Sequence, residues 1–206
     1  MSNIKDDQFT FNISLAVLNS LGRNLYRNFI TILGEAISNS WDADADNVKI
    51  IINREKSEML VIDDGDGMSV SDFSGKFLRI GYSKRTNGSN SRKGRPYIGR
   101  KGIGKLALLS CANRVVIVTK KAGEPVTGGV IDNSELDEAI QDDRDHESYK
   151  LGALSSEDIK LLGGMEQGTI IKFVNLKGGI VNTLENIRKA IALYFRFSLV
   201  DESFKI

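Results

Sequence analysis

The amino-acid sequence predicts an α/β fold, in which helices and the strands of a sheet follow one another along one chain. Several stretches repeat apolar residues every three or four positions, which is typical of helices that bury one face. Other stretches alternate apolar and polar residues, as strands with one buried face do. The length of 206 residues suits one substantial domain with its own core. We therefore expect residues 1–206 to form a single domain.

The overall composition is that of an ordinary globular protein, with 41% hydrophobic and 27% charged residues. The 28 Lys and Arg nearly balance the 27 Asp and Glu, so the net charge points neither to nucleic acid nor to a membrane surface. The single cysteine, Cys111, excludes an internal disulfide framework and suits a reducing compartment. No signal peptide or long apolar run is present, so we expect a cytoplasmic protein with no membrane partner.

Charge is nevertheless uneven along the chain. Residues 84–105 carry eight Lys or Arg and no acid, whereas residues 135–147 carry seven acids and one Arg. Residues 81–97 are also rich in Gly, Ser and Asn, a composition that buries little apolar surface, so we expect a mobile basic loop there. Residues 133–150 are expected to form an exposed acidic excursion.

The first third of the chain predicts two helices and a β-hairpin. A short strand at 9–12 follows a polar arm. Leucines at three- and four-residue steps predict a helix over 13–26, and a second helix is expected over 29–43. Alternation over 48–52 and a second apolar run at 59–62 predict the two strands of the hairpin.

The middle of the chain predicts two more helices and two strands. Residues 69–80 are expected to form a short helix with Ser69 or Ser71 as its N-cap. Residues 103–112 are apolar with a helical pattern. Strands are expected at 115–119 and 125–131.

The last quarter predicts a short helix over 155–162, capped by Ser155 or Ser156, and a strand over 168–176. A terminal helix is expected over 183–197. Its apolar face comprises Leu184, Ile187, Ile191 and Tyr194. Residues 197–206 look like the start of an extended segment that lacks a partner strand, so we expect the chain to be the N-terminal fragment of a longer protein.

The helix at 29–43 places Glu35, Asn39 and Asp42 on one stripe, at i, i+4 and i+7. Such a stripe could hold a hydrated cation and a water molecule. Taken alone it better fits the solvated face of an amphipathic helix, because apolar residues occupy the opposite side. Those apolar residues are Ile30, Leu33, Ile37 and Trp41.

Three local patterns resemble known binding loops but lack a required residue. Residues 99–106 read G-x-x-x-x-G-K-L, whereas a P-loop ends in Ser or Thr and follows a buried strand. Residues 42–53 begin like an EF-hand loop but end in Asn53, where calcium needs a bidentate Glu. Residues 63–67 also lack a downstream Glu. We therefore expect neither a P-loop nor a calcium site.

Four motifs in order along the chain resemble those of the GHKL superfamily of ATPases. They are Glu35-x-x-x-Asn39-x-x-Asp42-Ala43, Asp63-x-Gly65-x-Gly67-Met68, Gly99-x-x-Gly102-x-Gly104 and Gly168-Thr169 at the start of a strand. The superfamily includes gyrase-type topoisomerases, the heat-shock chaperone of ninety kilodaltons, mismatch-repair MutL proteins, MORC proteins and histidine kinases. The match covers about residues 13–200 and is closest in character to the MutL-, MORC- and chaperone-type members.

The resemblance implies a Bergerat ATP-binding fold. This is an α/β two-layer sandwich with a mixed, mainly antiparallel sheet, helices on one face and ATP between the layers. A lid is then expected over residues 81–101. Lys84, in the sequence Tyr82-Ser83-Lys84, resembles a lid lysine that lies near the phosphates in MutL-like and MORC-like members.

The second and fourth motifs are expected to bind the adenine. Asp63 would accept a hydrogen bond from the exocyclic amine, where guanine would present an acceptor instead. Gly65 and Gly67 would allow close backbone approach and positive φ, and Met68 would pack on the ring. Thr169 would reach Asp63 and the adenine through water, although a strand threonine chosen for β-propensity explains it equally well.

The third motif is expected to bind the phosphates, because backbone amides ahead of a helix favour anions and basic side chains add charge. Its residues are Gly99, Arg100, Lys101, Gly102, Ile103, Gly104 and Lys105. The first motif would contribute Asn39 as a ligand of Mg²⁺ and Glu35 as the base for the attacking water. Asp42 and Ala43 are carried over from the family pattern as nucleotide-binding positions.

The function expected from the resemblance is Mg²⁺-dependent ATP binding and slow hydrolysis, used as a conformational or dimerisation switch in a larger protein. Two alternatives remain: an atypical protein kinase and a nucleotide sensor without turnover. Histidine kinases usually carry Asn where Glu35 stands, and the only histidine, His146, lies in the acidic excursion. A nucleotide-dependent homodimer is expected, and DNA or a client protein could bind through further domains in a chaperone-like, DNA-processing or defence-associated role.

Overall fold

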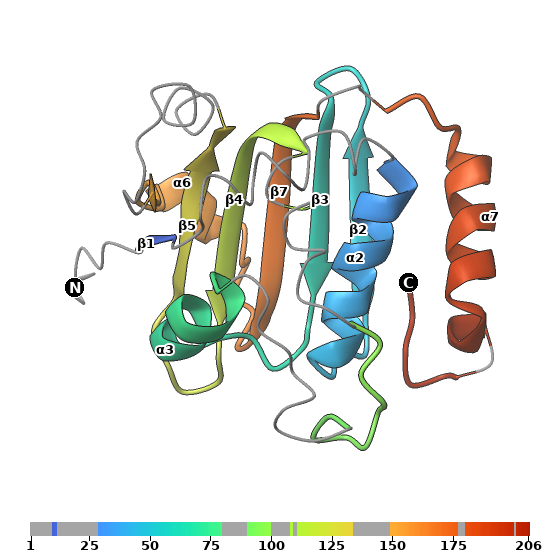
Figure 1. Ribbon diagram of the computed structural model, residues 1–206, viewed down its shortest axis with the longest axis horizontal. Helices are drawn as coiled ribbons and strands as arrows, with labels where there is room; N and C mark the ends of the chain where they lie inside the picture. The colour runs from blue at the N-terminus through green and yellow to red at the C-terminus, as the bar shows by residue number, and fades with distance from the viewer. Residues whose placement is uncertain are drawn as a thin grey trace.

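The computed structural model describes residues 10–11, 29–79, 90–99, 108, 111–133, 149–176, 180–199 and 201–206. Figure 1 shows a central sheet with α2 and α3 in front of it and α7 beside α2. The sheet has five strands in the order β2-β3-β7-β4-β5, and each pairs antiparallel with its neighbours. The predicted two-layer α/β architecture is confirmed. None of the described helices is long and apolar enough to cross a membrane.

The strands follow the predicted alternation closely. The central strands are β2 (Val48–Asn53), β3 (Glu58–Asp63), β4 (Ala112–Lys120), β5 (Thr127–Asp132) and β7 (Gly168–Leu176). Two short strands, β1 (Thr10–Phe11) and β6 (Tyr149–Lys150), pair antiparallel in a separate small sheet.

The helices are α2 (Phe29–Asp42), α3 (Val70–Asp72), α6 (Ser156–Lys160) and α7 (Leu184–Tyr194), with a π-helical turn at Phe73–Phe77 and a 3₁₀ turn at Arg196–Leu199. Ser69 and Ser155 cap α3 and α6, each in a reciprocal capping box with an aspartate three residues later. Thr183 caps α7 through a bond from the amide of Asn186. One serine of each predicted pair is therefore the cap.

The main core lies between the sheet and α2. Met59 and Phe173 of the sheet are fully buried, as is Ile37 of α2. Along β3, Met59, Val61 and Asp63 share the buried face because strand side chains alternate. The same alternation that buries two apolar side chains therefore turns the carboxylate of Asp63 toward the helical layer.

A second, smaller core covers part of the opposite face of the sheet. It joins Val116, Val118 and Val130 to Leu162, which follows α6. Figure 1 shows α6 behind the sheet at the side of β5 and β4, away from α2 and α3. The main helices lie on one face as expected, and α6 adds a small cover on the other.

The structure corrects three local expectations. The helix expected through residue 112 ends earlier, because Ala112 begins β4. Asn133 is not exposed: it is buried, and its amide nitrogen donates to the carbonyl of Ala112 at 2.6 Å. The terminal helix stops at Tyr194, which is exposed together with Leu184, so only part of the predicted apolar face is buried.

The end of the chain also differs from expectation. Lys205 forms a parallel bridge with Asn47, and the backbone amide of Val48 donates to the carbonyl of Lys205 at 2.8 Å. Phe204 is fully buried in the main core. The segment expected to lack a partner is docked against the edge of this domain, and we call residues 201–206 the tail.

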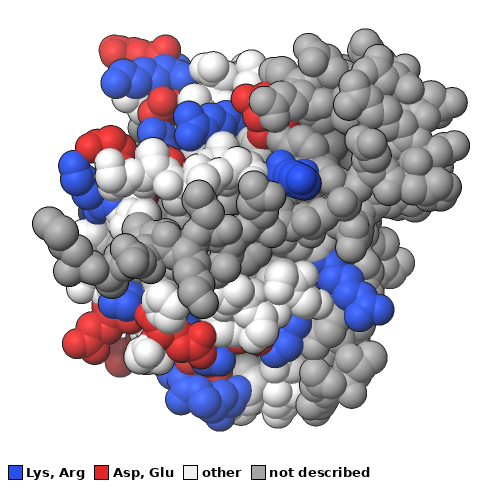
Figure 2. Space-filling model, turned by 90° about the vertical axis from the view of Figure 1, so that its left-hand side faces the viewer, with Lys and Arg blue, Asp and Glu red and all other residues white. Residues whose placement is uncertain are grey.

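Several predicted features lie outside the described residues: the helix over 13–26, most of the helix over 103–112, residues 81–89 of the basic loop and residues 134–148 of the acidic excursion. Figure 2 shows basic and acidic side chains interspersed on one face of the part that is described. That distribution agrees with the nearly balanced charge of the sequence.

Candidate functional site

The site forms where the C-terminal half of α2 contacts the end of β3, next to the start of β7. Asp63 is the last residue of β3 and pairs in register with Thr169, the second residue of β7. Both side chains are buried, with 7% and 8% of their surface exposed. The structure thus brings the second and fourth sequence motifs together beneath α2.

Asp63 is held by neutral hydrogen-bond donors. The hydroxyl of Ser40 donates to Oδ2 at 3.0 Å, and the backbone amide of Gly65 donates to Oδ1 at 3.0 Å. Burial raises the pKa of Asp63 to about 6, and the bonds from Gly65, Ser40 and Thr169 offset part of that rise. At neutral pH the site therefore presents a buried carboxylate with lone pairs left to accept a further donor.

Ser40 was not predicted from the sequence as a site residue. It lies on the apolar face of α2, among Ala36, Ile37 and Trp41, and is buried. A polar residue on the core side of an amphipathic helix was the signal that could have identified it.

Thr169 belongs to a small chain of hydroxyl groups. Its Oγ1 lies 3.0 Å from Oγ1 of Thr119 on β4, which also lies 3.0 Å from the carbonyl of Gly168. The amide of Met68 donates to the same Thr119 hydroxyl at 3.0 Å. Thr119, which sequence reasoning also missed, therefore ties the glycine loop after β3 to β4 and β7.

The two glycines of the second motif are required by neighbouring backbone. A Cβ at Gly65 would lie 2.7 Å from the carbonyl oxygen of Ala43, and one at Gly67 would lie 1.8 Å from that of Lys120. Gly67 also has a φ of +63°, as expected for a glycine-dependent turn. Ala43 further anchors this loop by accepting from the amide of Asp66 at 2.8 Å. The segments that approach these two glycines closely in the structure are thus the backbone just after α2 and the end of β4.

The place of Asp42 on the polar stripe suggested a cation as its partner, but in the structure its carboxylate binds backbone amides. It is buried, and its two carboxylate oxygens accept from the amides of Ile98 at 2.9 Å and Gly99 at 3.2 Å. A Cβ at Gly99 would lie 2.6 Å from Oδ2 of Asp42. Asp42 therefore fixes the position at which the third motif begins.

Glu35 and Asn39 occupy the half-buried part of the same stripe. Burial raises the pKa of Glu35, and the nearby charge of Asp42 raises it further. A carboxylate with a raised pKa at the edge of a site is suited to take a proton from water. Asn39, one turn later on α2, offers a neutral oxygen of the kind that Mg²⁺ accepts.

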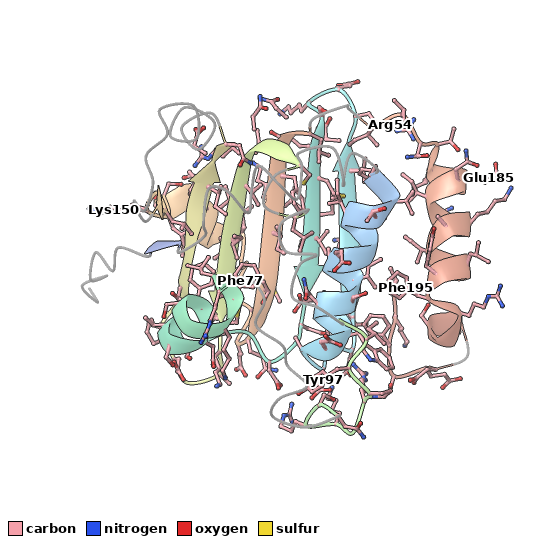
Figure 3. All side chains as sticks on the ribbon, in the orientation of Figure 1. Arg54, Phe77, Tyr97, Lys150, Glu185 and Phe195 are labelled. Carbon is pink, nitrogen blue, oxygen red and sulfur yellow. The ribbon has the colours of Figure 1, made fainter. Side chains whose placement is uncertain are left out.

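Residues 90–99, which we call the strap, run across the C-terminal end of α2. Asp44 accepts bonds from the hydroxyl of Ser91 and, at 3.0 Å, from the amide of Lys93. Arg92 forms an ion pair with Asp66 at 2.6 Å, in the loop after β3. In Figure 3, Tyr97 marks the strap at the lower end of α2. The described part of the loop expected to be mobile, residues 90–97, therefore makes specific contacts with the end of α2 and the loop after β3.

Ten of the predicted site residues are described. Glu35, Asn39, Asp42 and Ala43 lie on or just after α2; Asp63, Gly65, Gly67 and Met68 lie at the end of β3 and in its loop; Gly99 ends the strap and Thr169 is in β7. The other seven lie outside the described residues: Lys84, Arg100, Lys101, Gly102, Ile103, Gly104 and Lys105.

The fold, with a buried carboxylate beneath α2, defines the class of protein as a two-layer α/β domain with an antiparallel sheet. The chain belongs to the family of histidine kinase-, DNA gyrase B- and HSP90-like ATPases, whose model matches residues 26–169. The predicted membership of the GHKL superfamily is confirmed.

Two known proteins share sequence similarity with the chain. A putative type II restriction enzyme, HgiDII, from Herpetosiphon aurantiacus is 33% identical over 200 residues, which cover 97% of this chain and 31% of that protein. The chaperone protein HtpG from Wolbachia sp. subsp. Brugia malayi (strain TRS) is 29% identical over 133 residues, or 52% of this chain and 21% of the chaperone. The chain spans less than a third of the length of either relative.

Proposed function

We propose that this ATPase-family domain binds ATP with Mg²⁺, hydrolyses it slowly, and uses the cycle to change conformation or to dimerise within a larger protein. The observation that carries the proposal is the environment of Asp63. It is a carboxylate buried at the end of β3, with a pKa of about 6 and with neutral donors bound to its oxygens. Burying a charged carboxylate costs free energy, so we infer that either a bound ligand or the fold requires its charge.

Adenine fits this environment by its hydrogen-bonding pattern. Its exocyclic amine is a donor, which a buried carboxylate can accept, whereas guanine presents a carbonyl oxygen at the same position. Placing a carbonyl oxygen against the carboxylate would leave both groups without a donor in a buried site. Thr169, which pairs in register with Asp63, would bind the same base through water. Met68 is half-buried at the end of the loop and would pack on the ring.

The phosphates would bind beyond the point where Asp42 holds Gly99. The amides of Gly102, Ile103 and Gly104 would contact phosphate oxygens, with charge supplied by Arg100, Lys101, Lys105 and, from the lid, Lys84. Asn39 would hold Mg²⁺, whose remaining ligands are the triphosphate and water, and the ion would offset phosphate charge when bound. The carboxamide of Asn39 and its half-buried position suit that hard cation.

Glu35 would act as the base for hydrolysis. Its pKa is raised by burial and by Asp42, so its carboxylate takes up a proton more readily than an exposed glutamate. The carboxylates of Glu35 and Asp42 both extend from α2, which fixes their relative position. Glu35 would orient the attacking water and accept its proton, while Asn39 positions the cation one turn away.

The relative named as a restriction enzyme favours a DNA-linked, defence-associated role for the larger protein. We propose that ATP-dependent dimerisation in such a protein controls a DNA-processing activity located elsewhere. The similarity to HtpG supports the same nucleotide switch in a chaperone-like setting. Both roles require the proposed ATP cycle, so that cycle is tested first.

The test is single-turnover hydrolysis of Mg-ATP by wild type, Glu35→Gln and Lys105→Ala, with ATP affinity measured in parallel. Glu35→Gln should bind ATP nearly as wild type does and lose about 10²- to 10⁴-fold in rate, as is usual for removal of a general base. Undiminished hydrolysis by Glu35→Gln, with Lys105→Ala inactive, would instead support P-loop chemistry. ATP binding without any turnover by wild type would identify a sensor, and transfer of the phosphate to an added protein would identify a kinase.

A further inference from the structure

Arg95, in the strap, is a buried cation at a junction of three segments. Only 7% of its surface is exposed. Its guanidinium carbon lies 4.7 Å from the ring centre of Trp41 on α2 and 5.6 Å from that of Phe204 in the tail. Trp41 and Phe204 meet edge to face with their centres 5.2 Å apart. The strap, α2 and the tail therefore meet around one guanidinium group.

The hydrogen bonds of Arg95 reach the same segments. Nη2 donates to the carbonyl of Ser203 at 2.8 Å and to its hydroxyl at 3.2 Å, while Nη1 donates to the carbonyl of Ala45 just after α2. Asp46 pairs with the same side chain at 3.2 Å. Without the tail, the guanidinium would lose two acceptors and one aromatic contact, and would keep its contacts with Ala45, Asp46 and Trp41.

The strap contacts the proposed nucleotide site on both sides of Arg95. The residue after Arg95, Pro96, accepts a 2.9 Å bond from the indole of Trp41, and Gly99 follows three residues later on the carboxylate of Asp42. On the other side of the turn, Arg92 pairs with Asp66 in the loop that follows Asp63. The strap therefore contacts both the start of the third motif and the loop of the second.

We propose that Arg95 is a positioning residue that couples docking of the tail, residues 201–206, to binding of the triphosphate. The inference rests on the proposed ATP binding and adds a route by which nucleotide occupancy is passed out of the domain. When the tail is docked, Arg95 holds the strap so that Gly99, the first residue of the third motif, stays on the carboxylate of Asp42. When the tail leaves, the strap loses that support and the phosphate contacts weaken.

Coupling of this kind is reciprocal, so ATP must tighten the tail by the same factor by which the tail tightens ATP. The tail has a direct reporter, because the amide of Lys205 donates to the carbonyl of Asp46 at 2.8 Å and the amide of Val48 donates to Lys205. Exchange of those two amides with solvent measures how often the tail detaches. Adenosine, which lacks phosphates, should not slow that exchange.

The experiment measures the Kd values of Mg-ATP and adenosine, and the exchange rates of the Lys205 and Val48 amides, in the full chain. Wild type should show about tenfold slower exchange with Mg-ATP and little change with adenosine, within the usual range of coupling between two sites. Arg95→Met should weaken Mg-ATP about tenfold, leave adenosine binding nearly unchanged and abolish the ATP-dependent slowing. Arg95→Lys keeps the charge but not the forked set of donors. Its Mg-ATP affinity and its ATP-dependent slowing of exchange should therefore lie between those of wild type and Arg95→Met.

The control is Arg114→Met. Arg114 also pairs with a carboxylate, Asp158 at 3.7 Å, but extends from β4 toward α6 rather than toward the strap or tail. It should leave both Kd values and the exchange pattern as in wild type. The wild-type exchange measurement needs no variant, so the inference is tested even if Arg95→Met folds poorly.

Three results would overturn the inference. Exchange of Lys205 and Val48 unaffected by Mg-ATP in a wild type that binds both ligands would remove the coupling while leaving the proposed function intact. Equal loss of ATP and adenosine in Arg95→Met would assign Arg95 a general structural role. Failure of wild type to bind either ligand would overturn the proposed nucleotide site, and this inference with it.

Discussion

The hydroxyl of Ser40 donates a 3.0 Å hydrogen bond to Oδ2 of Asp63 and so joins α2 to the end of β3. The same hydroxyl lies 3.2 Å from the carbonyl of Ala36, one turn earlier on the helix. The bond from Ser40 lowers the pKa of this buried carboxylate, as the larger effect of the Gly65 amide also does, so both favour its charged form at neutral pH. A residue of the helical layer thereby contributes to the charge state of a residue of the sheet.

Ser40→Ala should raise the pKa of Asp63 further and weaken ATP at neutral pH. A hydrogen bond to a charged group contributes about 1.5–3 kcal/mol, so the pH below which ATP affinity falls should move up by about one unit or more. Titrations with ATP between pH 5 and pH 8, about the range over which Asp63 changes charge, measure the shift. Ser74→Ala is the matched control, since Ser74 bonds the carbonyl of Val70 four residues earlier but is exposed. An unchanged pH profile in Ser40→Ala would show that the bond does not tune Asp63.

The stability of the protein should depend on pH through Asp63. Its pKa is raised to about 6 in the folded state from 3.8, so the folded protein binds this proton more tightly than the unfolded chain does. Protonation therefore stabilises the fold, and the free energy of unfolding from this group rises as pH falls from about 6 to about 4. Relative to Asp63→Asn, wild type should lose on the order of 3 kcal/mol between pH 4 and pH 7. Denaturant unfolding of both proteins at several pH values measures that difference, and parallel curves would contradict it.

Asn39→Ala should distinguish the proposed role of Asn39 in binding Mg²⁺ from the proposed role of Glu35 as the base. We expect a loss of about tenfold or more in the affinity for Mg-ATP and little loss for ATP measured with a chelator, because only the metal contact is removed. Nucleotide titrations with and without Mg²⁺ distinguish this result from a general loss of fold. A variant whose affinity still depended on Mg²⁺ as wild type does would remove Asn39 from the metal site.

Gly67→Ala should destabilise the protein. The new Cβ would collide with the carbonyl of Lys120, and the φ of +63° is unfavourable for alanine. The cost should be about 3 kcal/mol or more, which lowers the melting temperature by roughly 6–12 °C for a chain of this size. Gly75→Ala is the control, since no atom of the described residues lies within 4 Å of a Cβ there. A melting temperature of Gly67→Ala equal to that of the control would show that the turn can relax around the methyl group.

Much of the fold follows from local pattern. The bounds of α2, of the β2–β3 hairpin and of β7 agree closely with the periodicity of their apolar residues, because each element buries one face against the same core. The end of α7 and the tail were harder to predict. Tyr194 and Leu184 have the right spacing for burial but are exposed, and Phe204 becomes a core residue by returning to Trp41 across more than 160 positions of sequence.

The site shows the same division between local and long-range information. Spacing within the motifs placed Glu35, Asn39 and Asp63 on the elements where the structure has them. It did not show that Asp42 binds the strap, that Ser40 and Thr119 join the site, or that Arg95 connects to Ser203. Each of these contacts joins segments distant in sequence, and sequence periodicity carries no information about which distant segments meet.

The most direct test of adenine recognition by Asp63 is calorimetric titration of wild type and Asp63→Asn with ATP and with GTP, both with Mg²⁺ at pH 7.5. Wild type should bind ATP about 100-fold or more tightly than GTP, because a carbonyl oxygen facing the buried carboxylate costs about 2–3 kcal/mol. Asp63→Asn should lose most of the ATP affinity while melting at a temperature no lower than that of wild type. Equal affinity of wild type for ATP and GTP, or undiminished ATP binding by Asp63→Asn, would contradict the assignment.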